Sequence, residues 1–238
     1  LLYAALGVHF WHTRWRINDK QAAPLPMQAW ERAAIFLALA LHGIGLYEGM
    51  FGSGSMLFSF SLALSLMLWL AVLIYWLESF RSRMDGLQPM VLPLAAACAL
   101  LPVAFPQVHQ IAHADAWGFK LHFLTAMLAY SLFTLSALHA VFMGLVGRKL
   151  HQRELTTQLT SLPPVLTMET LLFRMIAIAF SLLTMTLGSG LMFSEAIFGK
   201  AAPIDHKTLF AFTSWAIFAA LLIGRNVYGW RGRIALRW

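Results

Sequence analysis

The sequence predicts an all-α, polytopic integral membrane protein, and three observations support this fold class. First, 60% of the 238 residues are hydrophobic and only 11% are charged, whereas soluble domains carry about 25% charged residues. Second, apolar stretches near the roughly 20 residues that a membrane helix needs recur along the chain. Third, the basic residues are confined to alternate connections between these stretches. We therefore predict seven spans in a single transmembrane domain over residues 1–238.

The spans follow from the apolar stretches in chain order. The first, Leu1–Trp11, resembles the last part of a helix, so this span is expected to be incomplete. The others are predicted at Ala33–Met50, Met56–Glu78, Met90–Phe105, Phe119–Gly147, Thr170–Ile197 and Thr208–Tyr228. Met90–Phe105 is short and contains Pro93 and Pro102, so we expect a kinked or thinned span there. Both chain ends look trimmed, and eight spans are expected in the full protein.

The distribution of basic residues predicts the orientation. Fourteen of the 17 Lys and Arg residues lie in or beside the first, third, fifth and seventh connections; the exceptions are Lys120, Lys200 and Lys207. Positive residues remain on the cytoplasmic side of a membrane. The N-terminal end of the first span is therefore expected outside the cytoplasm of a bacterium. Because orientation explains the net charge of +7, no nucleic-acid partner is required.

Several chemical classes are excluded by missing motifs. Cys98 is the only cysteine, so the chain has no internal disulfide, no CxxC redox pair and no CxxCH haem attachment motif. It also has no glycine-rich phosphate loop, no HExxH and no GxSxG. No carboxylate is predicted near mid-membrane, where a proton-coupled transporter would place one.

Histidines are the main candidates for chemistry, because ionisable side chains inside a membrane are functional candidates by default. Neutral imidazole is also a common ligand of haem iron. Three of the nine, His9, His12 and His151, lie beside basic residues and are expected to be solvated at the cytoplasmic interface.

Depth separates the histidines of the spans. His122 lies about 7 Å and His42 about 10 Å below the outer edge, at 1.5 Å per residue. These similar depths would suit two axial ligands of one haem. His139 lies about 25 Å deeper than His122, so it cannot share that iron; it is either another ligand or an interhelical hydrogen-bonding residue. His206 follows Asp205, a natural N-cap, and a helix N-terminus would keep it neutral and able to bind a metal.

A different site is possible in the outer loop before His122. His109 and His113 are spaced i, i+4, so both would lie on one face if the loop were helical. With Asp115 or His206, they would form a divalent-metal site or part of a transporter. The alternative is that they are solvent-facing loop residues.

Three segments resemble the cytochrome c assembly protein family, which includes the CcsA and CcmC groups. Asp205-His-Lys-Thr-Leu-Phe-Ala-Phe-Thr-Ser-Trp215, followed by Gly229-Trp-Arg-Gly-Arg233, is similar to the end of the family's WWD segment. Leu121-His-Phe-Leu-Thr-Ala-Met-Leu-Ala-Tyr130 resembles the family helix that opens with an external haem-ligand histidine. Leu162-Pro-Pro-Val-Leu-Thr-Met-Glu-Thr-Leu-Leu-Phe173 resembles a subgroup, the YpjD-type inner membrane proteins. The resemblance covers most of residues 117–238 and, more weakly, residues 41–46.

The resemblance implies a haem-binding or haem-handling protein of the bacterial inner membrane, carrying non-covalent b-type haem. His122 is implied as an iron ligand, paired with His42 or His206, and apocytochrome c or another membrane protein as a partner. The outer loop Phe198–Asp205 lacks the WWD tryptophans, and haem lyase activity is implied by the resemblance alone. We therefore expect haem handling without lyase activity. A non-enzymatic accessory or regulatory subunit of a membrane complex is the alternative.

Overall fold

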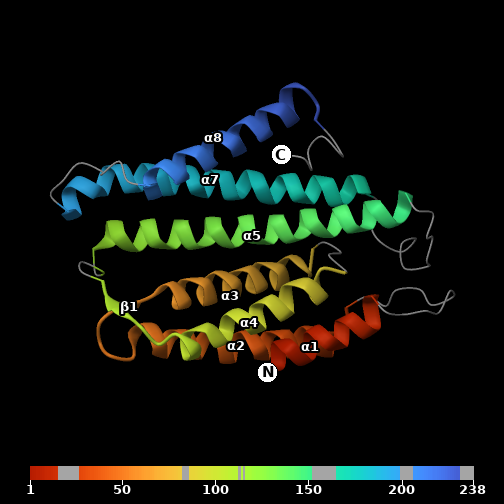
Figure 1. Ribbon diagram of the computed structural model, residues 1–238, viewed down its shortest axis with the longest axis horizontal. Coiled ribbons are helices and arrows are strands. Elements are labelled where there is room, and N and C mark those ends of the chain that lie inside the picture. Colours follow the sequence, from red (N-terminus) through yellow and green to blue (C-terminus); the bar gives the residue numbers. More distant parts are fainter. Residues whose placement is uncertain are drawn as a thin grey trace.

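The computed structural model describes residues 1–15, 27–81, 86–111, 114, 116–151, 165–198 and 206–230, which form a bundle of long helices (Figure 1). Seven α-helices lie in these ranges: α1 (Leu2–Phe10), α2 (Ala29–Phe51), α3 (Phe60–Glu78), α4 (Gln88–Ala104), α5 (Trp117–His151), α7 (Val165–Phe198) and α8 (His206–Val227). A π-helical turn, η1 (Trp11–Trp15), follows α1, and two short strands, β1 (Leu57–Phe58) and β2 (His109–Gln110), pair antiparallel.

The helices confirm the predicted fold class. Five of them, α2, α3, α5, α7 and α8, are long and apolar enough to cross a membrane. α4 is a shorter apolar helix of 17 residues, in agreement with the short span expected there. α1 has 9 residues. The protein is therefore a polytopic α-helical membrane protein.

α5 occupies the middle of the bundle (Figure 1). It packs against α7 on one side and α3 on the other, while α4, α2 and α1 lie beyond α3. α8 packs against α7 and also reaches α5, where the rings of Phe218 and Phe133 stack with centroids 4.1 Å apart. Only 11% of its apolar stretch is buried, against 50% for α5. A polar side chain on the α7-facing side of α5 is thus shielded from lipid by protein.

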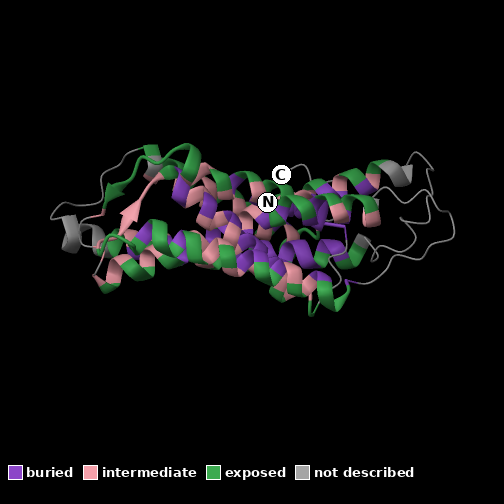
Figure 2. Ribbon diagram, turned by 90° about the horizontal axis from the view of Figure 1, so that it is seen from below, coloured by how far each residue is buried: buried purple, intermediate pink, exposed green. Residues whose placement is uncertain are grey.

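Buried residues are concentrated along the middle of the bundle and exposed ones on its outside (Figure 2). The core joins helices that are far apart in sequence, with Phe10 of α1, Ile35 of α2, Tyr75 of α3 and Leu135 of α5 each 0% exposed. Large apolar side chains elsewhere remain exposed, including Trp117 at 84% and Phe210 at 71%. This exposure is expected of a surface whose solvent is lipid.

The structure corrects the sequence-based helix boundaries at one end of the bundle. The sequence predicts a helix from Met56, but Leu57 and Phe58 form β1, and α3 begins only after Ser59, whose hydroxyl accepts a hydrogen bond from Leu62 N at 3.1 Å. This serine N-cap stabilises the start of α3 there. His109 lies in β2 opposite Phe58, so no helical turn begins at His109, and His113 lies outside the described residues.

Ion pairs gather at the other end of the bundle, which we call the basic end. It holds the last turns of α1, α3, α5 and α8 and the first turns of α2, α4 and α7 (Figure 1). There Arg174 of α7 pairs with Glu78 of α3, and Arg225 of α8 pairs with Glu169 of α7. The end at which α5 and α8 begin is called the opposite end. Two of the basic residues from which the membrane orientation was predicted therefore also form ion pairs between helices.

Candidate functional site

A polar seam runs between α5 and α7 in the half of the bundle toward the opposite end. His122 Nδ1 lies 3.1 Å from Ser189 Oγ, and the Ser189 hydroxyl donates to Thr186 O at 3.0 Å. One turn further in, the hydroxyl groups of Thr186 and Thr125 are 3.1 Å apart. Ser189, Thr186 and Thr125 are all buried, whereas His122 is half-buried. The imidazole therefore sits at the outer edge of an otherwise buried polar contact.

Glycine on α7 lets the His122 ring approach the helix. A Cβ atom at Gly190 would lie 3.3 Å from Cε1 of His122, a tighter contact than a side chain normally makes. Small residues permit such close approach between membrane helices. The Gly188-Ser189-Gly190 segment thus supplies both the space and the hydrogen-bonding group for this histidine.

His42 lies in a different part of the bundle, on α2. Its Nε2 is 2.8 Å from Ser65 Oγ of α3, and its ring meets that of Tyr3 edge-on with centroids 5.6 Å apart. His42 and Tyr3 border a mainly apolar cavity of about 450 Å³ between the first four helices. Two buried polar atoms there, His42 Nδ1 and the Tyr3 hydroxyl, have no hydrogen-bond partner among the described residues.

His42 and His122 do not lie at the same depth. Ser65, which contacts His42, is close in α3 to Met67, whose sulfur accepts a hydrogen bond from Thr134 of α5 at 3.5 Å. α3 and α5 run in the same direction (Figure 1). Counting along α5 at 1.5 Å per residue separates the two histidines by about 15 Å. The similar depths expected from the sequence are not found, because the ends of α2 and α5 do not lie level.

His139 links α5 to α7 near the basic end. It is 2% exposed, and its Nε2 lies 3.0 Å from the backbone oxygen of Met168. A carbonyl oxygen only accepts hydrogen bonds, so the proton is on Nε2. His139 thus makes the interhelical hydrogen bond that was one of its two possible roles.

The remaining sequence candidates are either exposed or outside the described residues. His206 is the first residue of α8 and is exposed, and His109 is exposed in β2. Asp205, His113, Asp115 and the side chain of Phe198 lie outside the described residues. In the part of the chain that is described, no group of three His, Cys, Asp or Glu residues is placed to hold a metal ion. No described hydrogen bond or ring contact joins any two of His42, His122, His139 and His206.

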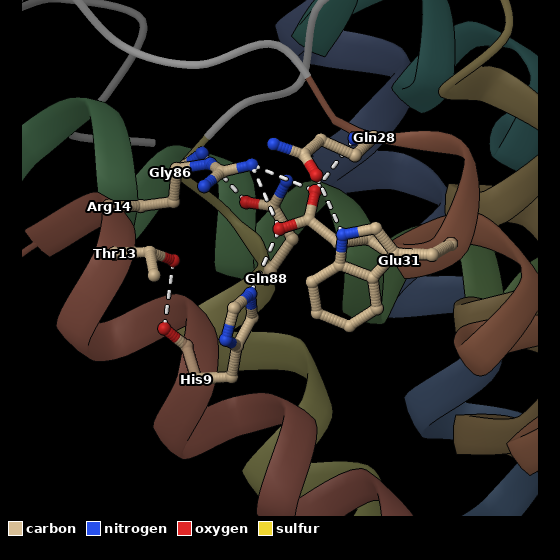
Figure 3. A network of polar contacts seen from close by, with 8 residues as sticks. His9, Thr13, Arg14, Gln28, Glu31, Gly86 and Gln88 are labelled. Atoms are coloured by element: carbon tan, nitrogen blue, oxygen red, sulfur yellow. Dashed lines mark hydrogen bonds and ion pairs between the residues drawn. The ribbon is translucent and has the colours of Figure 1, made fainter.

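A buried carboxylate at the basic end was not identified from the sequence. Glu31 of α2 is 2% exposed and accepts hydrogen bonds from Arg14 Nη2 at 2.9 and 3.1 Å, from His9 Nε2 at 2.9 Å and from Gln28 N at 2.7 Å (Figure 3). The capping pair formed by Gln28 and Glu31 was readable as Gln three residues before Glu. The contact with Arg14 was not, because it depends on how α1 and α2 pack. His9 is therefore paired with a carboxylate rather than only solvated.

The fold and the histidines between its helices define a polytopic α-helical membrane protein with candidate ligand residues at several levels of the bundle. Comparison of sequences identifies the group more closely. The chain belongs to the cytochrome c assembly protein family, whose sequence model matches residues 29–238. That range contains His42, His122, His139 and His206.

Individual relatives agree with this assignment. The inner membrane protein YpjD of Escherichia coli (strain K12) is 29% identical over 216 residues, which are 86% of this chain and 78% of that protein. An uncharacterized 28.8 kDa protein of Azospirillum brasilense is 27% identical over 154 residues, 63% of this chain and 57% of that protein. The cytochrome c biogenesis protein CcsA of Prochlorococcus marinus (strain MIT 9301) is 41% identical over 66 residues, 28% of this chain and 21% of that protein. No solved structure matches the chain.

Proposed function

We propose that this chain is a haem-handling protein of the bacterial inner membrane, with residues 1–238 acting as one transmembrane domain and His122 as an iron ligand. Membership of the cytochrome c assembly protein family and the similarity to YpjD, which is named as an inner membrane protein, support this assignment. The observation that carries it is the anchoring of the His122 ring to α7: Nδ1 is hydrogen-bonded to Ser189 and the Thr186 backbone is a second hydrogen-bond partner of the ring, so Nε2 is the nitrogen assigned to iron in this proposal. Haem-ligating histidines have this division of roles, with one nitrogen anchored and the other on the metal.

The other histidines fit a haem iron less well. His139 uses Nε2 to reach Met168, and its Nδ1 is enclosed by protein. His42 uses Nε2 to contact Ser65, and its Nδ1 is also enclosed. Either ring would have to break a hydrogen bond or turn before it could bind iron through Nε2. The contact of His122 with Ser189, by contrast, uses Nδ1.

A second histidine ligand, if the iron takes one, would best be supplied by His206. It begins α8, which packs against the same helix, α7, that holds His122. Trp215 of α8 donates to Thr184 of α7 at 3.0 Å, and from this contact both helices continue toward the opposite end. His206 and Ser189 therefore lie in the same outer part of the bundle. His42 remains the alternative, at a different depth.

The expected partner is a protein that supplies thiols for haem attachment. Bound haem supplies a redox-active iron and two vinyl groups to which thiols can be attached. Cys98, the only cysteine, is buried in α4, so any thiols must come from a partner such as apocytochrome c. The basic end is cytoplasmic in this proposal, which places His122 toward the periplasmic face, where haem would be held or passed on. An accessory protein that binds another membrane protein without haem is the competing function.

The test is the pyridine haemochrome spectrum of the purified protein in detergent. We expect the native protein to carry b-type haem and His122→Ala to lose most of it, because the iron loses a ligand. His139→Leu is the matched control: it removes an equally intramembrane imidazole, but one assigned to helix packing, and should retain haem. Comparing His206→Ala with His42→Leu identifies the second ligand.

Two results would contradict the proposal. One is native protein without haem after expression in cells with an ample haem supply. The other is a His122→Ala variant with native haem content. Co-purification of a partner membrane protein, unaffected by all four histidine substitutions, would favour the accessory function.

A further inference from the structure

The contact between His122 and α7 has a direction that follows from the hydrogen-bonding capacity of each atom. The Ser189 hydroxyl has one proton and lies 3.0 Å from Thr186 O, a carbonyl oxygen that only accepts. That proton is therefore directed to the carbonyl. Ser189 Oγ is left as an acceptor toward His122 Nδ1, 3.1 Å away. In this arrangement the ring proton lies on Nδ1, and the backbone of Thr186 is a second hydrogen-bond partner of the ring.

From this arrangement we infer that Ser189 is a positioning residue for His122, which it holds in the Nδ1–H form, so that the lone pair available to a ligand is on Nε2. Which nitrogen of a histidine carries the proton is set by the hydrogen bond that the ring makes. In the alternative form the Ser189 hydroxyl would have to donate to Nδ1 and give up its bond to Thr186 O. Gly190 assists, because a side chain there would press on the ring.

Burial makes the hydrogen bond between Ser189 and His122 more stabilising than the same bond would be at an exposed position. Ser189 is 8% exposed and Thr186 is 7% exposed, so water cannot readily replace the lost partner. A buried polar atom left without a partner loses its hydration without compensation, so the bond is costly to break. His139 shows the contrast within the same pair of helices: its proton is on Nε2, held by Met168 O. Two histidines of α5 thus carry their protons on different nitrogens because α7 offers them different groups.

This inference rests on the proposed role of His122, but its first test needs no haem. Protein labelled with ¹⁵N-histidine is studied by magic-angle spinning NMR at a pH where the ring is neutral, and His122 is assigned from the signal lost in His122→Ala. We expect Nδ1–H in the native protein, a mixture of both forms in Ser189→Ala, and recovery of Nδ1–H in Ser189→Thr, which keeps the hydroxyl. Ser136→Ala removes an equally buried hydroxyl of α5, bonded only to Leu132 O at 2.7 Å, and should leave the signal unchanged.

A second readout applies if haem is bound. A hydrogen bond from the ring N–H makes a ligating histidine more basic, and a more basic ligand favours ferric iron. Ser189→Ala should therefore raise the midpoint potential, while Ser136→Ala leaves it unchanged. Native His122 protonated on Nε2, or a Ser189→Ala protein with an unchanged ring state, would overturn the role of Ser189. Absence of haem with the expected ring states would instead refute the proposed function and leave this inference standing.

Discussion

Glu31 illustrates how one residue can join several segments inside a membrane protein. Its carboxylate accepts hydrogen bonds from Arg14, His9 and the backbone of Gln28, and both Glu31 and Arg14 are nearly fully buried, at 2% and 4% side-chain exposure (Figure 3). A buried charge is tolerated only when it is paired and hydrogen-bonded. The network therefore fixes the π-helical turn η1 against the first turn of α2.

Replacing Glu31 by Gln should strongly destabilise the protein. Arg14 would then be a buried cation without its counter-charge, and breaking a buried ion pair from one side costs about 3–5 kcal/mol. Thermal unfolding in detergent, followed by tryptophan fluorescence, measures the effect. Glu48→Gln is the matched control, because Glu48 is an exposed residue of the same helix and exposed substitutions change stability by about 0.5 kcal/mol or less. Equal melting temperatures for the two variants would contradict this account.

At the scale of residues, the sequence indicated which histidines are candidate ligands, but not which residues contact them. His122 was identifiable as a histidine near the outer end of a span. Ser189 is 67 positions away, and no pattern along the chain shows which helix faces it. Depth was also predicted imperfectly, since His42 was measured from the end of its own helix. Contacts between helices, such as Thr134 with Met67, are needed to place two helices at a common height.

Among the helices, α1 and α4 show a close contact that depends on glycine. A Cβ at Gly7 of α1 would lie 2.8 Å from Cγ of Pro93, so the proline ring packs directly on the glycine backbone. Pro93 lies inside α4, where proline removes a backbone hydrogen bond and strains the helix. α4 nevertheless continues from Gln88 to Ala104. Packing against α1 helps to hold this interrupted helix in place.

Gly7→Ala should therefore destabilise the bundle although alanine favours helices. Relief of the clash requires α1 and α4 to separate, and such overpacking costs about 1–3 kcal/mol, against a gain of up to about 1 kcal/mol in helix propensity. Gly45→Ala is the control, because no atom lies within 4 Å of a Cβ at that position. We expect a lower melting temperature for the first variant and an equal or higher one for the second. The opposite order would show that the contact with Pro93 is not maintained.

Much of the arrangement of helices was predictable because a bilayer imposes simple requirements. A span must be apolar and long, so hydropathy located each of the seven helices in the described ranges, five of which are long enough to cross a membrane. The start of α3 was missed because Leu57 and Phe58 are as apolar as the helix that follows, and their place in a strand depends on pairing with residues 109 and 110. The peripheral position of α8 could not be predicted from the sequence either. The apolar stretches of α8 and α5 have the same mean hydropathy, 1.6, but differ in the share that is buried.

For the molecule as a whole, the distribution of charge predicts which end faces the cytoplasm. Residues 53 and 81 lie near the opposite end and the basic end, respectively, and both are exposed. In a Cys98→Ala background, Ser53→Cys should react with a membrane-impermeant maleimide in spheroplasts. Arg81→Cys should react only after the membrane is permeabilised, because the basic end is expected inside. Labelling in the reverse order would invert the topology and place His122 toward the cytoplasm.

The 17 residues of α4 also affect the lipid around the protein. At 1.5 Å per residue this helix is about 25 Å long, whereas the hydrocarbon core of a typical bilayer is about 30 Å thick. α4 meets lipid through side chains such as Leu100 and Val103, which are 62% and 80% exposed. Lipid beside a short helix thins to match it, at a cost of a fraction of a kcal/mol per Å. The annulus of lipid should therefore be uneven, compressed next to α4 and relaxed next to α7, so that acyl-chain length would act unequally on the two sides of the bundle.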